Sequence, residues 1–389
     1  MLSEKELVAQ QLLEAAERVG QLAEQESQEA EKNATISANV VNLMKESKLH
    51  RMMLPKKYGG PQVDLKTFAR IVRKVAWHNM SAAWLTYFFP LHNVLTSYLP
   101  PNARDEIVNQ GGLIADIFAP VGKGQVDGDG FRISGVYNYG SGVLYCDWIG
   151  LGVILQLPES PQPEFCMLIM PTSEVTINKN WDTFGLRATG SHQVVVDNVY
   201  VPRDRMIRLQ VADTTWRPPE EDYDKDYPYY HVPFFPAYFM GFPSIALGGT
   251  ERILHEFKNY SARRLRVLEG IMEGDNPRAQ RALAEMTVEF HAAEALMNQY
   301  IDLLEGHRTG NVIGRGQFFA IRTKIIKSCV DIAVRALQAM GAEALYKGGI
   351  VEQHLRDILS LATHKTSLYE DALSAYGVEL FGRPSGAMG

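Results

Sequence analysis

The sequence predicts an α+β fold in which a small β-domain lies between two helical regions. Apolar residues recur at helical spacing toward both ends of the chain, whereas glycines and runs of valine, isoleucine and leucine gather between residues 113 and 205. The chain has 389 residues, of which 46% are hydrophobic. It is therefore long enough for two or three domains with a sizeable core.

The N-terminal region, residues 1–112, is expected to be a helical domain. Ser3 and Glu6 have the Ser-x-x-Glu spacing of a capping box, in which the two residues satisfy backbone N–H groups at a helix start. Apolar residues follow at intervals typical of one helix face: Leu7, Val8, Leu12, Ala15, Val19 and Leu22. Further helical stretches separated by short turns fill the rest of the region.

The central region, residues 113–205, is expected to be the β-domain. The runs 148–157, 165–170 and 194–201 are rich in β-branched and aromatic residues, which favour strands. Pro202 closes the last run because proline cannot donate a ladder hydrogen bond. Before that run lies the turn-rich loop 185–191, in which Gly185 and Gly190 can adopt backbone angles that other residues avoid.

The segment 206–238 reads as an irregular loop rich in proline, acidic and aromatic residues. Its aromatic side chains suit a lid or pocket wall for a flat aromatic substrate, or equally a subunit interface, and both interpretations stay open. From residue 239 to 381 helical spacing returns, with runs at 239–272, 277–308 and 313–341 and a last helix ending near Phe381. Residues 382–389 are expected to form a flexible tail.

Composition excludes several functional classes. A net charge of −6 argues against nucleic acid as the main partner. No run approaches the roughly 20 apolar residues that a membrane span needs, and no signal peptide is visible. The three cysteines are far apart and form no CxxC pair, which fits a reducing cytoplasm. No histidine or carboxylate spacing indicates a metal site, so none is expected.

Five segments resemble, in the same order, motifs of the acyl-CoA dehydrogenase superfamily, and together they span nearly the whole chain. They are Leu-Pro-Lys-Lys-Tyr-Gly-Gly at 54–60, Tyr-Asn-Tyr-Gly-Ser-Gly at 137–142 followed by Asp-Trp at 147–148, Gly-Leu-Arg-Ala-Thr-Gly-Ser at 185–191 with its valine-rich continuation to Pro202, Gln-Ala-Met-Gly-Ala at 338–342, and Arg-Asp at 356–357. The resemblance implies an acyl-CoA dehydrogenase-like fold whose C-terminal helices form a four-helix bundle.

The resemblance also implies a flavin between the β-domain and the C-terminal helices. Ser141 matches the hydroxyl residue that hydrogen-bonds the reactive ring nitrogen of the flavin. Arg264 matches a helix arginine that pairs with cofactor phosphate, a task that suits its fork of donors. A solvated charge within the basic run 263–266 is the open alternative for Arg264. The other cofactor-binding residues that the motifs imply are Phe118, Ala119, Gly142, Thr189, Ser191 and Gly341.

The same resemblance indicates which chemistry this chain has lost. Acyl-CoA dehydrogenases need a carboxylate base, in most members a glutamate that follows the Arg-Asp pair. Counting from that pair places Lys365 at the glutamate position, and a lysine is normally protonated. Some members carry the base on an earlier helix, where this chain has Gly241. The sequence therefore predicts the flavin scaffold without the dehydrogenase base.

Two histidines match a different branch of the superfamily. His92 and His364 resemble histidines of the oxygenase components of two-component monooxygenases, which use reduced flavin. An imidazole with an ordinary pKa of about 6.5 can accept a substrate proton or protect a flavin hydroperoxide. His92 is expected to orient or deprotonate the substrate, and His364 to lie near the hydroperoxide. A structural role stays open for both, and His192 is a weaker candidate.

The function implied is oxygenation of a small, aromatic or heteroaromatic substrate by O2 and reduced flavin, FMNH2 or FADH2, which a separate reductase delivers. The scaffold implies a homotetramer in the cytoplasm. Two alternatives stay open. A diverged acyl-CoA dehydrogenase with its base elsewhere would hold oxidised FAD tightly, and a flavin- or ligand-binding protein would show no turnover.

Overall fold

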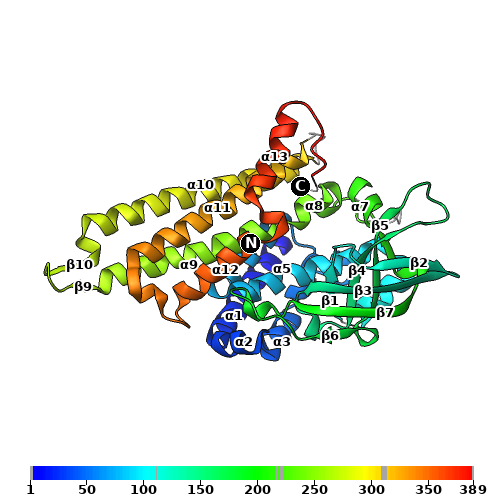
Figure 1. The fold of residues 1–389 in the computed structure, drawn as a ribbon, viewed down its shortest axis with the longest axis horizontal. Coiled ribbons are helices and arrows are strands. Elements are labelled where there is room, and N and C mark those ends of the chain that lie inside the picture. Colours follow the sequence, from blue (N-terminus) through cyan, green and yellow to red (C-terminus); the bar gives the residue numbers. More distant parts are fainter. Residues whose placement is uncertain (1–2, 111, 216, 219–222, 308–312, 388–389) are drawn as a thin grey trace.

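The computed structural model describes residues 3–110, 112–215, 217–218, 223–307 and 313–387. The β-domain follows one set of helices along the chain and precedes another, and in space it lies at one end of the molecule (Figure 1). The N-terminal helices are α1 (Glu4–Gln25), α2 (Ser27–Asn33), α3 (Ala38–Glu46), α4 (Leu65–His78), α5 (Met80–Leu95) and α6 (Pro101–Asn109). The predicted capping box is confirmed, since Ser3 Oγ accepts the Glu6 N–H and the Glu6 carboxylate accepts the Ser3 N–H.

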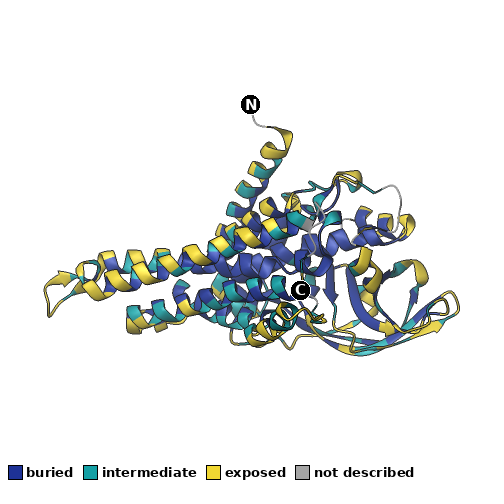
Figure 2. Cartoon of the chain, turned by 90° about the horizontal axis from the view of Figure 1, so that it is seen from above, coloured by how far each residue is buried: buried dark blue, intermediate teal, exposed yellow. Residues whose placement is uncertain are grey.

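Helix α5 lies in the interior of the molecule. Every residue in it is buried except Phe88, which is half-buried. Such a helix carries no polar face, because neighbouring elements surround it on all sides. In Figure 2 the deeply buried residues lie where the helical layers meet the β-domain. Polar side chains on α5 are consequently enclosed, and each must find its partner inside the protein.

The β-domain consists of two four-stranded sheets. Its strands are β1 (Ile114–Ile117), β2 (Lys123–Asp127), β3 (Gly130–Gly140), β4 (Trp148–Leu155), β5 (Glu164–Pro171), β6 (Thr176–Asn178), β7 (His192–Pro202) and β8 (Met206–Arg208). One sheet has the order β1-β4-β5-β8, with β1 parallel to β4, and the other has the order β2-β3-β7-β6. The β3–β7 register pairs Gly140 with His192, so the residues that follow β3 meet those that precede β7.

The segment 206–238 is more ordered than the sequence predicts. It contributes β8 to the first sheet and then forms helices α7 (Leu209–Thr215) and α8 (Phe234–Tyr238), while residues 216 and 219–222 lie outside the described part. Most of its aromatic side chains are core residues rather than a lid or an exposed interface, since Tyr227, Tyr230 and Phe235 are at most 3% exposed. The Tyr227 hydroxyl donates to the Met53 carbonyl at 2.5 Å, which ties the segment to the N-terminal helices.

The C-terminal region forms the expected helical bundle, with two differences. The helices are α9 (Gly241–Arg263), α10 (Pro277–His307), α11 (Arg315–Met340), α12 (Ile350–Ala362) and α13 (Tyr369–Leu380). The run expected at 239–272 ends at Arg263 and continues as a hairpin, β9 (Leu265–Arg266) and β10 (Ile271–Met272). The single last helix is two helices, α12 and α13, joined by a turn.

Helices α9, α10, α11 and α12 pack against one another as a four-helix bundle, and α13 lies against α11 and projects from it (Figure 1). None of the helices in the described ranges combines the length and the apolar character of a membrane span.

Candidate active site

A chain of buried hydroxyl groups joins the end of β3 to the loop before β7. Ser141 Oγ accepts the indole N–H of Trp84 at 2.9 Å and lies 2.8 Å from Ser191 Oγ. Ser191 Oγ in turn lies 2.7 Å from Thr189 Oγ1. The backbone closes the same junction, since the Gly142 N–H donates to the Thr189 carbonyl at 2.9 Å. Four of the predicted cofactor-binding residues therefore form one connected group.

Gly142 allows this close approach. Its φ of +68° lies in the left-handed region, and a Cβ there would lie 2.8 Å from the ring of Phe89. Glycine avoids both the backbone strain and the overlap. The glycine of this motif thus has a steric role that lets the Ser141 turn lie directly on α5.

His92 lies within α5 and is 1% exposed. Its Nδ1 is 2.6 Å from the Ile114 carbonyl oxygen, which can only accept, so Nδ1 carries a proton. Its Nε2 is 3.1 Å from Asp116 Oδ2 but is not aligned with it as a hydrogen bond, and it has no hydrogen-bond partner among the described residues. Tyr238 donates its hydroxyl to the same Asp116 oxygen at 2.8 Å. In a neutral His92 the proton acceptor is therefore Nε2, and it lies beside a carboxylate that would stabilise the imidazolium.

The sequence predicts a last helix that ends near Phe381, but His364 lies in the turn after α12 and caps the short 3-10 helix Lys365–Ser367. Its ring centroid is 4.7 Å from that of Phe242 and 5.9 Å from that of Trp84. Burial, and then the nearby cation of Arg322, lower the pKa of His364 to about 4. His364 is consequently neutral near pH 7 and cannot readily take up a proton.

Trp84 and Phe88, one turn apart on α5, connect the two histidines. The Phe88 ring is 5.1 Å from Trp84 and 5.1 Å from His92, while Trp84 contacts both Ser141 and His364. Because Phe88 is the half-buried residue of this helix, the cluster opens toward solvent at its ring. The three predicted catalytic residues thus lie around one aromatic centre.

The predicted residue Phe118 lies at the edge of this cluster. Its ring centroid is 5.0 Å from that of Tyr238, the residue that holds Asp116. Ala119, which follows it, is exposed. The end of β1 therefore borders the site on the side of His92.

Two predicted cofactor residues, Arg264 and Gly341, lie elsewhere. Arg264 follows the last residue of α9, whose first turn carries Phe242, and 23 helical residues span about 34 Å. The Arg264 side chain is 49% exposed, lies 3.9 Å from Glu273 Oε2 and donates to the Tyr260 hydroxyl. Tyr260 donates to the carbonyl of Met340, the residue before Gly341. These two residues thus lie together, far from Ser141 within one chain.

Neither of the two positions that correspond to the base of acyl-CoA dehydrogenases carries a carboxylate. A Cβ at Gly241 would overlap the Tyr87 ring, so the site has no room there for a carboxylate side chain. Lys365 is exposed in the turn beyond His364. The weaker candidate His192 accepts the Trp181 N–H at Nδ1, 3.2 Å away, and burial lowers its pKa.

Sequence reasoning missed Asp116, Tyr238 and Arg322. The sequence carries a weak indication for Asp116 and for Arg322. Asp116 is the one charged residue in an otherwise apolar four-residue strand, and Arg322 lies on the buried face of α11, four residues before the buried Ile326. A charge on a buried face is unusual enough to suggest a role.

The Arg-Asp motif clamps the loop that carries the hydroxyl residues. Arg356 Nη1 donates to the Phe184 carbonyl at 2.9 Å, and Asp357 Oδ1 accepts the Leu186 N–H at 2.6 Å. Arg356 also pairs with Glu31 at 2.9 Å. The motif therefore joins the C-terminal bundle, the β-domain loop and the N-terminal helices.

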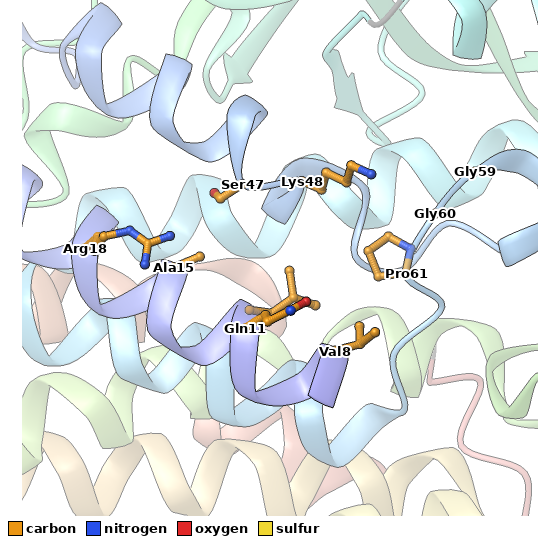
Figure 3. A pocket seen from close by; sticks show the side chains of 10 residues that line it. Val8, Gln11, Ala15, Arg18, Ser47, Lys48, Gly59, Gly60 and Pro61 are labelled. Atoms are coloured by element: carbon orange, nitrogen blue, oxygen red, sulfur yellow. The ribbon is translucent and has the colours of Figure 1, made fainter. Parts of the chain in front are cut away.

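The surface hollow shown in Figure 3 is separate from this cluster. It encloses about 350 Å³ between α1 and the turns around residues 47–48 and 59–61, with Arg18 and Lys48 at its edge. None of the predicted site residues lines it. The chemistry argued from the sequence therefore belongs to the buried cluster on α5.

Known proteins resemble this chain over nearly its full length. The family model described as the C-terminal domain of acyl-CoA dehydrogenase matches residues 240–367. The oxygenase subunit HsaA of a flavin-dependent monooxygenase from Rhodococcus jostii is 24% identical, over 92% of this chain and 95% of that protein. The oxygenase component of p-hydroxyphenylacetate 3-hydroxylase from Acinetobacter baumannii is 23% identical, over 95% of this chain and 89% of that protein.

Among solved structures, XiaF from a Streptomyces species, in complex with FADH2 and glycerol, superposes with a TM-score of 0.90. Its sequence is 21% identical, and the match covers 99% of this chain and 98% of that chain. This likeness establishes the fold that the sequence motifs predict.

Proposed function

We propose, from the premise that the chain belongs to the acyl-CoA dehydrogenase superfamily, that it is the oxygenase component of a two-component flavin-dependent monooxygenase. The observation that carries the proposal is the site itself. His92, His364 and Ser141 surround one aromatic centre, while the Tyr87 ring fills the space that a dehydrogenase base at Gly241 would need.

The cofactor is a reduced flavin, FMNH2 or FADH2. The residues fit such a group, because a buried row of hydroxyl groups from Ser141, Ser191 and Thr189 offers donors and acceptors beside a half-open aromatic surface. When bound, the reduced flavin supplies the electrons that activate O2. A separate reductase delivers it, which accords with the relatives described as oxygenase subunits or components.

The substrate is a small aromatic or heteroaromatic molecule with an acidic hydrogen. The rings of Trp84, Phe88 and Phe242 form walls suited to a flat ring. His92 Nε2 takes the substrate proton, and Asp116 stabilises the imidazolium. His364 faces the same rings and orients a group by hydrogen bonding.

The protein is a homotetramer in the cytoplasm. Arg264 and Gly341 lie at the opposite end of α9 from Phe242, which contacts Trp84, and the helix is about 34 Å long, so a second copy is needed to present them to a flavin phosphate. The described cysteines are free and buried, as suits a reducing compartment.

Oxygen-isotope labelling tests the proposed function. The protein is mixed with photoreduced FMN or FAD and a panel of phenols and indoles under ¹⁸O2, and products are analysed by mass spectrometry. One ¹⁸O atom in a product is expected, and its yield should fall at least tenfold in His92→Gln. Bleaching of bound oxidised FAD by an acyl-CoA, with no labelled product, would instead assign the chain to the dehydrogenases.

A further inference from the structure

Arg322 is the most unusual charge in the described part of the chain. Its side chain on α11 is fully buried, and no carboxylate of the described residues pairs with it. Its Nε and Nη2 donate to the Thr366 carbonyl at 3.1 and 2.9 Å, and its guanidinium lies 5.0 Å from the ring centroids of Phe239 and Phe319. Burying an unpaired cation lowers folding stability, which suggests that Arg322 has a role other than packing.

The Thr366 carbonyl that Arg322 holds belongs to the same turn as His364. Thr366 also contacts His364 directly. The Thr366 N–H donates to His364 Nδ1 at 3.2 Å, and Thr366 Oγ1 is 2.9 Å from the same nitrogen. A backbone N–H can only donate. Nδ1 is therefore the acceptor, and the single proton of a neutral His364 must lie on Nε2.

The surroundings also oppose a second proton on this ring. Protonating Nδ1 would direct it against the Thr366 N–H and would place two cations in a buried region. The elements that pack against the ring contribute Trp84 from α5, Phe242 from α9 and Arg322 from α11, so Arg322 is the one charged group that faces it among the described residues. Burial and this cation together keep the pKa of His364 at about 4.

We infer that Arg322 and Thr366 are positioning residues that fix His364 as a neutral imidazole protonated on Nε2, so that it serves as a hydrogen-bond donor and not as a base. A neutral His92 has the opposite tautomer, because the Ile114 carbonyl accepts from its Nδ1 and leaves Nε2 as the acceptor. The two histidines of the site therefore divide the tasks of accepting and donating a hydrogen. This division deepens the proposed function and rests on it, whereas the protonation state of His364 can be measured without any turnover.

Nitrogen NMR of the histidine rings tests the inference. The full-length protein is labelled with ¹⁵N,¹³C-histidine, and the His364 signals are identified by their loss in His364→Gln. The expected spectrum shows a neutral ring with the proton on Nε2 from pH 5.5 to 9. Spectra of the wild-type protein alone can overturn the inference. They would do so by showing an imidazolium at pH 6, or a neutral ring with its proton on Nδ1.

Variants on α11 then identify the cause. Arg322→Met should raise the pKa of His364 by at least one pH unit, whereas Arg322→Lys, which keeps the charge, should raise it less. Arg335→Met removes an arginine from the same helix at an ion pair with Glu285 and should leave His364 unchanged. Equal shifts in Arg322→Met and Arg335→Met would refute the role of Arg322. If Arg322→Met does not fold, Arg322→Gln, which removes the charge but keeps a donor for the Thr366 carbonyl, takes its place, and a shift equal to that in Arg335→Met would refute the role of Arg322.

These outcomes are separate from those of the proposed function. If no ¹⁸O enters any product while the NMR spectra are as expected, the oxygenase function fails and the assignment of His364 stands. If labelled product forms while His364 carries its proton on Nδ1, the function stands and the positioning role of Arg322 and Thr366 fails.

Discussion

Replacing Asp357 by asparagine should stabilise the protein at high pH. Asp357 is 1% exposed, its Oδ1 accepts the Leu186 N–H at 2.6 Å, and its Oδ2 has no hydrogen-bond partner among the described residues. Burial raises the pKa of this carboxyl from 3.8 to about 7; nearby Glu31 and Glu352 also raise it, whereas the Leu186 N–H and Arg356 oppose the shift. The charged form is therefore unfavourable in the folded protein.

The sign and size of the effect follow from proton linkage. Between pH 3.8 and about 7 the folded chain binds a proton that the unfolded chain releases, so the free energy of unfolding falls as pH rises through this window. The folded and unfolded pKa values of Asp357 differ by about three units, which lowers the free energy of unfolding by at most about 4 kcal/mol at pH 8. Asparagine keeps an oxygen for Leu186 but adds an NH2 group that needs an acceptor, which costs about 1–3 kcal/mol.

Urea unfolding at pH 5, 6, 7 and 8 measures the effect as a difference between Asp357→Asn and wild type. The variant should gain stability relative to wild type as pH rises, by about 1–3 kcal/mol between pH 5 and pH 8. Asp331→Asn, which removes a carboxylate from a surface ion pair with Lys327, is the matched control. A pH-independent difference for Asp357→Asn would show that this carboxyl carries no unfavourable charge.

Three further changes test other parts of the site. Ser141→Ala removes the proposed hydrogen bond between this hydroxyl and the flavin, which is worth about 1 kcal/mol, so reduced flavin should bind about fivefold more weakly in anaerobic titration. An unchanged Kd would show that Ser141 does not contact the flavin. Tyr238→Phe takes the hydroxyl from Asp116 and should lower the free energy of unfolding by about 1–2 kcal/mol, which urea denaturation would detect or exclude. Burial lowers the pKa of His50 and His354 to about 4, so their contribution to stability is present above pH 6.5 and is lost as pH falls toward 4. His354→Leu should therefore become more stable relative to wild type as pH falls from 6.5 to 4.5, and a constant difference would contradict the shift.

Local sequence patterns were sufficient for several elements of the fold. The capping box at Ser3 and the strands from Trp148 and Phe165 depend on neighbouring residues, and each lies where the sequence predicts. The candidate site residue Ser141 was identified through the family resemblance and not through a local pattern. The aromatic segment 206–238 could not be placed in the core in this way, because its burial depends on contacts such as Tyr227 with Met53, 174 residues away.

The residues that set the chemistry of the histidines depend on distant contacts. Tyr238 reaches Asp116 across 122 positions, and Arg322 reaches Thr366 across 44. No periodicity or motif joins such pairs, since only the tertiary contacts of α8 with β1 and of α11 with the turn after α12 bring them together. The end of α12 at Ala362, which places His364 in a turn, also escapes prediction because no proline or glycine marks it.

The measurement that tests the central claim most directly is stopped-flow absorbance during flavin reoxidation. Protein equilibrated with anaerobically reduced FMN or FAD is mixed with oxygenated buffer, and the spectrum is followed from 350 to 500 nm. We expect a distinct species that persists for seconds before oxidised flavin appears, and that decays faster when substrate is present. Reoxidation as fast as that of free flavin, with no intermediate phase for either flavin, would contradict it.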